Sequence, residues 1–438
     1  MRVAIVGGGP VGLFCSIALA RRGREAVVIE RDPAPSADGS WDRRGVMQFR
    51  IAHLLRHIVR QSLYAEMPDV WHAMVAAGGV PAKPDGFPDE MAGLQSRRST
   101  FERAWWSVAL RQPGLTVVHG TAESIRTGSD RVAGVVVDGE VIDAEIVIVA
   151  SGRTTHLGDE YRAPGEGGAC GFSYAARMYR ARDGVDCPTS PIPIGVLHDG
   201  YQTIVFPQDD RTLSTVFVRP TDDARFSNLR HEGAFQAAAR AIPNLAPWTD
   251  PDRFDPILPV LAGSGLSNTY RSTLDENGDV PLAGLFFVGD AVSTTNPAAG
   301  RGVSLGLRQA SELLRLLDEV GTDYGSAASA FDSWCTEHIR PWFEDHVYWD
   351  RTLLDRLRGN VIDIEARLSS DVICAAAQHD PSLMGVVGPF LGMLVPPTAL
   401  RSVEDEVRGM LRSGWRPAYG DGPSAAELET VMVPAAVR

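Results

Sequence analysis

Lysine is almost absent from this sequence. Lys83 is the only lysine among the 42 basic residues, so arginine supplies the rest. A phosphate-binding loop and a lysine Schiff base each need a lysine at a defined place, whereas Lys83 lies in a polar segment between two prolines. The sequence therefore excludes most enzyme classes whose chemistry depends on lysine.

Cysteines are few, basic residues are outnumbered by acidic residues, and long apolar runs are missing. The five cysteines are scattered without metal-ligand spacing, which is typical of free thiols in a reducing compartment. The formal net charge of -13 argues against nucleic acid or an anionic membrane as the main partner. Apolar runs stay short of the about 18 residues that a membrane helix needs, and a strand expected from residue 2 leaves no room for a leader peptide. We expect a cytoplasmic protein with no integral membrane segment and no metal site.

The N-terminal residues contain the pattern around which the chain is organised. Residues 2–6 predict a buried strand, residues 13–20 a helix and residues 26–30 a second strand. Alternation of strands with helices is typical of a parallel sheet in an α/β domain.

Three glycines separate the first strand from the helix. Gly7, Gly9 and Gly12 have the G-x-G-x-x-G spacing, in which the first permits a tight turn, the second lets the backbone approach a pyrophosphate and the third allows close packing. The helix directs free N–H groups at the phosphates, and Glu30 follows at the distance expected of an acid that binds ribose hydroxyls. The segment predicts a dinucleotide site.

Two later segments predict strands of the same domain. Residues 144–150 form a continuously apolar run typical of a central parallel strand, which ends at Ser151 and Gly152. Residues 285–288 form another and end at Gly289 and Asp290.

The 438 residues suit two or three domains, and 44% hydrophobic with 22% charged residues is ordinary for a soluble protein. The fold class that we expect is α/β, with a Rossmann-like dinucleotide domain from residues 1–168 and 280–325. Alternating strands with intervening turns predict an inserted antiparallel-sheet substrate domain over residues 169–279, and residues 326–438 predict a helical C-terminal region.

Three local expectations depend on spacing and composition. Apolar residues at helical spacing predict a helix over residues 51–58. Pro341 is expected to kink a long C-terminal helix, and the proline- and glycine-rich tail after Arg416 is expected to be partly mobile.

The separated segments agree in order and spacing with one known family. The glycine turn with Glu30, the strand end at residues 150–153 and the run from Gly289-Asp290 to residues 296–303 together resemble FAD-dependent monooxygenases of the aromatic hydroxylase (p-hydroxybenzoate hydroxylase-like) superfamily. In that superfamily the Gly-Asp motif continues through a proline to a Gly-x-Gly helix start. The resemblance covers about residues 1–320.

Smaller motifs are similar to one branch of that superfamily. Residues 44–48 with His53, and the Ala-Ser-Gly-Arg sequence at residues 150–153, look closer to the bacterial flavin epoxidases of polyether biosynthesis than to p-hydroxybenzoate hydroxylase.

The resemblance implies bound FAD and its ligands. Asp290 would meet the ribityl chain, Gly302 and Val303 would offer N–H groups to the pyrimidine edge, where reduced flavin carries negative charge, and Arg44 and Arg98 would bind ribose or pyrophosphate. A surface ion pair is the alternative for each arginine. The full expected cofactor set is Gly7, Gly9, Pro10, Val11, Gly12, Glu30, Arg31, Arg44, Gln48, Arg98, Ala122, Ser151, Gly152, Gly289, Asp290, Pro297, Gly300, Gly302 and Val303.

The resemblance also implies the reaction. Reduced FAD would add O2 to form a C4a-hydroperoxide, which delivers one oxygen atom to an alkene or an electron-rich ring of a small apolar or aromatic molecule, while the protein excludes water. The antiparallel sheet would cover the substrate, with Phe172, Tyr174, Phe206 and Phe217 as lining residues; core packing is the alternative for each. The catalytic candidates are His53, Ser293, Asn296 and Pro297, and a purely structural role is the alternative for His53.

Departures from the family pattern bear on the electron source and on halogenation. Single-component hydroxylases usually have an acid where this chain has Ser151, and that acid serves flavin and nicotinamide binding together. Its absence argues against direct reduction by NADPH or NADH and favours a separate flavin reductase that uses NADPH or NADH; both routes stay open. The Trp-x-Trp-x-Ile-Pro run of flavin halogenases is missing, and Lys83 is poorly placed to act as a halogenase's lysine.

Three other functions compete with oxygen insertion. One is an FAD-dependent reductase or oxidase that transfers hydride, similar to geranylgeranyl reductase. The second is a flavin-binding regulator without turnover. The third, a pure NAD(P) dehydrogenase, explains residues 1–30 but leaves Gly289-Asp290 unexplained. The arginine-rich composition is typical of a GC-rich bacterial genome, and the resemblance favours specialised metabolism.

Overall fold

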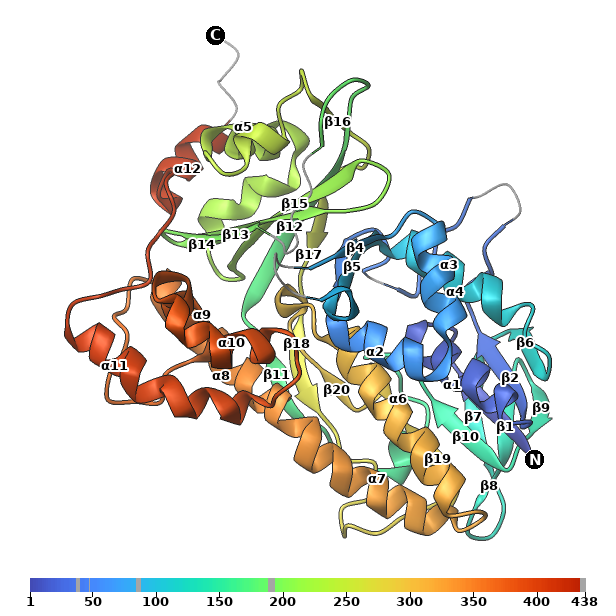
Figure 1. Ribbon diagram of the computed structural model, residues 1–438. Helices are drawn as coiled ribbons and strands as arrows, with labels where there is room; N and C mark the ends of the chain where they lie inside the picture. Colours follow the sequence, from blue (N-terminus) through green and yellow to red (C-terminus); the bar gives the residue numbers. More distant parts are fainter. Residues whose placement is uncertain (37–39, 47, 84–87, 188–193, 434–438) are drawn as a thin grey trace.

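The computed structural model describes residues 1–36, 40–46, 48–83, 88–187 and 194–433. A parallel sheet flanked by helices, an antiparallel sheet and a group of C-terminal helices occupy three regions of the molecule (Figure 1). This confirms the expected α/β class with an inserted antiparallel sheet.

The parallel sheet has five strands in the order β19-β10-β1-β2-β6. These are β1 (Arg2–Val6), β2 (Glu25–Glu30), β6 (Leu115–His119), β10 (Ile146–Val149) and β19 (Leu285–Phe287). Because every pairing is parallel, the carboxyl ends of β1, β10 and β19 meet at one edge. The glycine turn, Ser151 and Gly289 therefore lie together, as ligand sites of open α/β sheets do.

Helices α1 (Pro10–Arg21) and α6 (Gly302–Glu319) pack side by side on this domain. A Cβ atom on Gly306 would lie 2.5 Å from Cγ2 of Val11, so a glycine is needed at this close approach. The domain also contains α2 (His57–Glu66), α3 (Pro68–Ala76), α4 (Arg98–Ala109), a sheet of β3 (Ala52–Leu55), β4 (Val80–Ala82) and β5 (Gly93–Arg97), and a sheet of β7 (Ala122–Thr127), β8 (Val132–Val137) and β9 (Glu140–Asp143).

The antiparallel sheet has the order β13-β14-β15-β12-β16, with β17 also paired to β12. Its strands are β12 (Phe172–Ala181), β13 (Ile194–His198), β14 (Tyr201–Pro207), β15 (Thr212–Pro220), β16 (Phe254–Pro256) and β17 (Leu261–Gly263). Helix α5 (Glu232–Ala241) and helix α12 (Ala425–Met432) lie together over one face (Figure 1), with Phe217 and Leu428 in their shared core.

A smaller three-stranded sheet and the C-terminal helices complete the fold. The sheet consists of β11 (Glu166–Ala169), β18 (Ser267–Tyr270) and β20 (Ser293–Thr294). The helices are α7 (Tyr324–His338), α8 (Arg340–Leu357), α9 (Ser370–His379), α10 (Met384–Leu391) and α11 (Glu404–Arg412). Trp342 is buried where α8 meets α10, because its ring stacks on Phe390 at 5.5 Å.

Two of the three local expectations are corrected by the structure. Within residues 51–58 the chain forms β3, in which Leu55 pairs with Leu94 of β5, and α2 begins only at His57; a short apolar run does not distinguish a strand from a helix. Pro341 lies in the first turn of α8, where its missing N–H has no helical partner to lose, so it starts this helix. The described part of the tail includes α12, whose start is capped by Ser424 and Glu427; its partial mobility stays a prediction.

Candidate functional site

A cavity of about 550 Å³ joins the two sheets. Gly7, Gly9 and Asp290 line it at the carboxyl edge of the parallel sheet, and Tyr174 and Phe206 line it on the antiparallel sheet. The dinucleotide turn and the predicted substrate sheet thus face one continuous space.

The three glycines of the turn meet different surroundings. Gly7 has a φ of +111°, and a Cβ atom there would lie 2.5 Å from the carbonyl oxygen of Ala150. A Cβ atom on Gly12 would collide with the Gly7 carbonyl oxygen, whereas a Cβ atom on Gly9 would have no atom within 4 Å. The turn is therefore closed at its first and third glycines and open at Gly9, which is the arrangement that a pyrophosphate needs.

Glu30 is held by the protein itself. Its Oε2 accepts a hydrogen bond from the Gly8 N–H at 2.7 Å, its Oε1 accepts one from the Asp32 N–H at 2.8 Å, and Arg43 also binds Oε2. Glu30 lines the cavity, but these bonds make it a support of the glycine turn in addition to its expected role as a ribose ligand.

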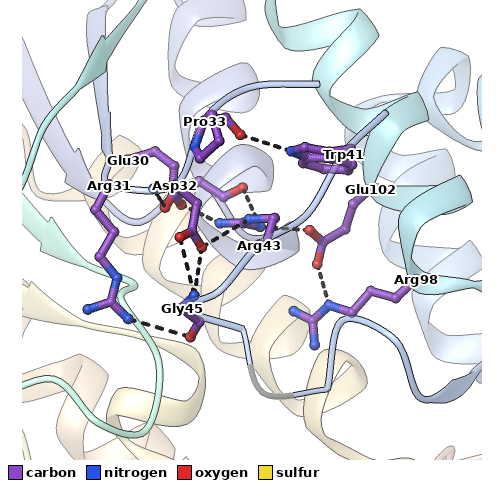
Figure 2. A network of polar contacts seen from close by, with 10 residues as sticks. Glu30, Arg31, Asp32, Pro33, Trp41, Arg43, Gly45, Arg98 and Glu102 are labelled. Carbon is purple, nitrogen blue, oxygen red and sulfur yellow. Dashed lines mark hydrogen bonds and ion pairs between the residues drawn. The ribbon is translucent and has the colours of Figure 1, made fainter. Parts of the chain in front are cut away.

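Arg43 is the arginine that the loop after β2 buries (Figure 2). Its guanidinium lies between Glu30 and Glu102, with Nη1 2.6 Å from Oε2 of Glu102. Burial opposes its charge, but Glu102 and Glu30 outweigh burial and raise the pKa of Arg43. Arg44, the expected FAD ligand, is exposed and lies outside the cavity lining.

The charge network continues from Glu102 to His53. Glu102 binds Nε of Arg98, whose Nη1 lies 3.4 Å from Nε2 of His53. His53 places Nδ1 2.8 Å from the Ile51 carbonyl oxygen, so Nδ1 carries the hydrogen and Nε2 faces Arg98 as an acceptor. Burial, together with the charge of Arg98, lowers the pKa of His53 to about 3. His53 is therefore neutral at physiological pH and can act there through hydrogen bonding.

The expected flavin edge is assembled at the start of α6. Asp290 faces the cavity from the turn after β19, and its Oδ1 lies 3.6 Å from the place of a Cβ atom on Gly302. Surrounding protein raises the pKa of Asp290, and the charges of Arg98 and Arg153 oppose that rise. The first N–H groups of α6 have no partner within the helix, so an acceptor and several donors face one region of the cavity.

Ser151 follows β10 (Ile146–Val149) at the position for which the family resemblance implies an acid. Its hydroxyl donates a hydrogen bond to Oγ1 of Thr155 at 2.8 Å. Gly152 follows with a φ of +82°, and Arg153 also lines the cavity. This edge of the cavity thus has a hydroxyl and a guanidinium in place of a carboxylate.

Two of the four aromatic residues predicted to line the substrate site do line the cavity, and two do not. Tyr174 and Phe206 line the cavity together with Ile204, Val216 and Leu266. Phe217 pairs with Ala175 in the register of β12 and β15, so its side chain lies on the opposite face, in the core with α5. Phe172 shares the cavity-side face of β12 with Tyr174 but is buried in the core beyond the cavity lining.

Of the three catalytic candidates that precede α6, only one lines the cavity. Pro297 lines the cavity, whereas Ser293 and Asn296 are buried outside its lining. Asn296 lies behind the wall and accepts a hydrogen bond from the hydroxyl of Tyr174.

The cavity brings together most of the residues that the sequence singled out. Those that line it are Gly7, Gly9, Pro10, Val11, Glu30, Arg31, Gln48, His53, Arg98, Ala122, Ser151, Gly152, Tyr174, Phe206, Gly289, Asp290, Pro297, Gly300, Gly302 and Val303. Those outside the lining are Gly12, Arg44, Phe172, Phe217, Ser293 and Asn296. The lining residues that were not predicted include Arg43, Ile204, Val216 and Leu266. For Ile204 and Val216 the available signal was the apolar alternation of β14 and β15. For Arg43 it was the position beside Arg44.

The described residues offer no site for a metal ion. They contain no cluster of three or more histidine, cysteine, aspartate or glutamate side chains that could hold one. None of their helices is both long and apolar enough to span a membrane.

Comparison with known proteins relates the glycine turn to FAD-dependent enzymes. The family model described as DAO, FAD dependent oxidoreductase, matches residues 2–87. Over these residues the chain is similar to FAD-dependent oxidoreductases. The chain is also 27% identical over 344 residues to 3-demethoxyubiquinol 3-hydroxylase of Escherichia coli (strain K12), an alignment that covers 75% of this chain and 82% of that protein.

Solved structures show the same fold. The flavin-dependent brominase Bmp2 superposes with a TM-score of 0.67 at 17% identity, covering 94% of this chain and 100% of the brominase. PqsL, a probable FAD-dependent monooxygenase from Pseudomonas aeruginosa, superposes with a TM-score of 0.62 at 16% identity, covering 82% and 98%. The expected resemblance to the flavin monooxygenase fold is confirmed.

Proposed function

We propose that this protein is an FAD-dependent monooxygenase that inserts one oxygen atom of O2 into an apolar or aromatic small molecule, by hydroxylation or epoxidation. The observation that carries the proposal is the single cavity lined both by the glycine turn and by apolar side chains of the antiparallel sheet. A cofactor on the turn and a substrate under the sheet would share that space, so water would be excluded from their contact.

The chemistry of the residues that line the cavity fits FAD. The open space at Gly9 accommodates a pyrophosphate at the N-terminus of α1. Asp290 offers a carboxylate to the ribityl hydroxyls, and the N-terminus of α6 at Gly302 and Val303 offers N–H groups to the pyrimidine edge. When bound, FAD would supply the activation of O2, while the protein binds, orients and shields the reactants.

Oxygen insertion has more support than halogenation. The named activity of the Escherichia coli relative is a hydroxylation, and hydroxylation of an aromatic ring is the corresponding proposal here. Lys83, the only lysine in the sequence, forms an ion pair with Asp89 at 3.5 Å and lies outside the cavity lining. A halogenase's lysine therefore has no counterpart in this cavity.

We also propose that a separate flavin reductase, using NADPH or NADH, supplies the electrons. Ser151 replaces the acid of single-component hydroxylases, and its hydroxyl is bound to Thr155. Direct reduction by NADPH or NADH is the alternative. Cytoplasmic location and a role in bacterial specialised metabolism belong to the same proposal.

An isotope experiment tests oxygen insertion. The FAD-loaded protein is reduced under anaerobic conditions, first with NADPH or NADH alone and then with a flavin reductase or dithionite, and mixed with 18O2 and a panel of apolar aromatic and alkene compounds. The proposal predicts reduction by the reductase and a product that contains one 18O atom. Conversion of a substrate without 18O would support hydride transfer by a reductase or oxidase, and would contradict the proposal.

A further inference from the structure

We infer that Asp345 of α8 is a positioning residue of the proposed FAD site, and that it acts through Arg301 to hold the start of α6 where reduced flavin needs it. The inference rests on the proposed function, because it takes the N-terminus of α6 to be the flavin edge. None of the residues of α8, all of which the structure describes, lines the cavity. The helix therefore acts on the site from behind its wall.

Residues 296–301 form the segment that leads into α6, and this segment is part of the cavity wall. Pro297, Gly300 and Arg301 line the cavity, and α6 begins at Gly302. Gly300 has a φ of +60°, in the left-handed region that favours glycine. Because the segment runs directly into α6, the way it is held decides where the first N–H groups of the helix lie.

α8 binds this segment at both of its ends, where the helix passes beside β18 and β20 (Figure 1). At the first residue, Nδ2 of Asn296 donates a hydrogen bond to Oδ1 of Asp350 at 2.9 Å. At the last residue, Nη1 of Arg301 donates one to Oδ2 of Asp345 at 2.9 Å. All four side chains are buried, so water does not compete for these bonds.

The side chain of Arg301 is enclosed by α8. Its Cζ lies 4.9 Å from the ring centre of Trp342 and 5.3 Å from that of Trp349. Nδ1 of His346 lies 3.3 Å from the same Nη1, but burial and the neighbouring cations lower the pKa of His346 well below its ordinary value, so this ring is neutral. Asp345 therefore supplies the negative charge that the buried guanidinium needs.

A second arginine makes the charge of Asp345 necessary. Nε of Arg56 donates a hydrogen bond to the carbonyl oxygen of Ala299 at 3.2 Å, so two guanidinium groups hold the same segment. They repel each other, since the charge of Arg301 adds to burial in lowering the pKa of Arg56 to about 10. If Asp345 lost its charge, this repulsion would be less compensated, and Arg301 would move together with the backbone that leads into α6.

Such a movement affects the two redox states of FAD differently. Reduced flavin carries negative charge near its pyrimidine edge, and the free N–H groups at the start of α6 favour negative charge. Hydrogen bonds to a charged acceptor are about twice as strong as neutral ones, so displaced donors weaken the binding of reduced FAD more than that of oxidised FAD. A general loss of stability would weaken the binding of both states alike.

Two variants test the inference on the FAD-loaded protein. A fluorescence titration gives the affinity for oxidised FAD, and an anaerobic titration against a reference dye gives the midpoint potential of the bound flavin. In Asp345→Asn the affinity for reduced FAD should fall about tenfold relative to that for oxidised FAD, which lowers the two-electron potential by about 30 mV. Asp371→Asn is the matched control, because Asp371 of α9 pairs with Arg356 near the end of α8; this variant should keep the wild-type potential.

Hydrogen exchange of the wild type is a second test that needs no variant. If α8 holds the segment beside the flavin, bound FAD must make the separation of α8 from that segment less favourable. With free FAD in excess, exchange of the α8 amides should slow about tenfold or more relative to that of α12, which packs with α5 on the antiparallel sheet. This result decides the question if Asp345→Asn does not fold.

Four results would overturn the inference. An unchanged or raised potential in Asp345→Asn would do so, because loss of a negative charge alone favours the anionic reduced flavin. An equal fall in Asp371→Asn would show a merely structural role. Equal slowing of exchange in α8 and α12, or a wild type that binds no FAD, would also contradict it. None of these measurements involves turnover, so a product without 18O would count against oxygen insertion and leave this inference standing.

Discussion

Nη1 of Arg43 lies 2.6 Å from Oε2 of Glu102 in a region closed to solvent (Figure 2). The pair joins the loop after β2 to α4, and it places one arginine between the acid at the end of β2 and the acid that holds Arg98. Burial would raise the pKa of Glu102, but the charges of Arg98 and Arg43 lower it. The network therefore stays charged beside the proposed FAD site, whose lining includes Glu30, Arg43 and Arg98.

Loss of Arg43 should destabilise the fold. Arg43→Gln leaves Glu102 and Glu30 buried with one positive partner fewer, and breaking a buried pair typically costs about 3–5 kcal/mol. Arg44→Gln changes an exposed neighbour and should alter the free energy of unfolding by less than about 0.5 kcal/mol. Chemical denaturation measures both variants. Equal stability of the two would contradict the assignment of Arg43 as the buried arginine.

Gly9 and Gly12 should respond differently to the same added methyl group. In Gly12→Ala the Cβ atom meets the Gly7 carbonyl oxygen, so we expect a loss of about 3 kcal/mol of stability or more from overpacking. In Gly9→Ala the Cβ atom meets open space, so stability should stay within about 1 kcal/mol while FAD affinity falls about tenfold or more. Thermal unfolding without FAD and a flavin-binding titration separate the effects. An unchanged FAD affinity in Gly9→Ala would place the pyrophosphate elsewhere.

Asp350 should make stability depend on pH. Burial raises its pKa to about 7, against the hydrogen bonds from Asn268 and Asn296 and the charge of Arg301. The folded protein then binds more protons than the unfolded chain between about pH 4 and pH 7, so this contribution to stability is lost as pH rises through that window.

The variant Asp350→Asn does not ionise and isolates this effect. The stability of the wild type relative to the variant should fall by about 2–3 kcal/mol from about pH 5 to about pH 8. Chemical denaturation at several pH values measures the difference. A difference that does not change with pH would show that Asp350 does not titrate in this window.

His53 should remain neutral well below its ordinary pKa. Burial and the charge of Arg98 lower its pKa to about 3, so the folded protein resists a proton that the unfolded chain accepts below about pH 6.5. His53 therefore costs stability as pH falls from that value. Its ring signal in an NMR titration, assigned by its loss in His53→Gln, should stay constant from about pH 8 to about pH 5. A midpoint near pH 6.5 would contradict the burial of the ring.

The glycine turn and the strands around it could be predicted because their signal is local. The spacing of Gly7, Gly9 and Gly12 is set by the geometry of one turn, and Glu30 follows directly at the end of the next strand. Continuous apolar runs also predicted β10 and β19 as parallel strands of the domain.

The rest of the site depends on loop paths, strand register and helix packing, which a single sequence does not specify. The path of the irregular loop after β2 decides whether Arg43 or Arg44 is buried. The sequence alone therefore could not distinguish the two arginines. Phe217 and Tyr174 lie on opposite faces because of the register of β12 with β15. Asn268 and Asp350 are 82 residues apart in the chain, and only packing of α8 against β18 brings them together.

The most direct measurement of the central claim is the flavin content of the purified protein after reconstitution with FAD and removal of free cofactor. The account predicts a visible flavin spectrum with about one FAD per chain in the wild type, and a marked loss of bound FAD in Gly9→Ala at unchanged folding. A folded wild-type protein that retains no FAD would contradict the account, because the cavity between the two sheets would then serve another ligand.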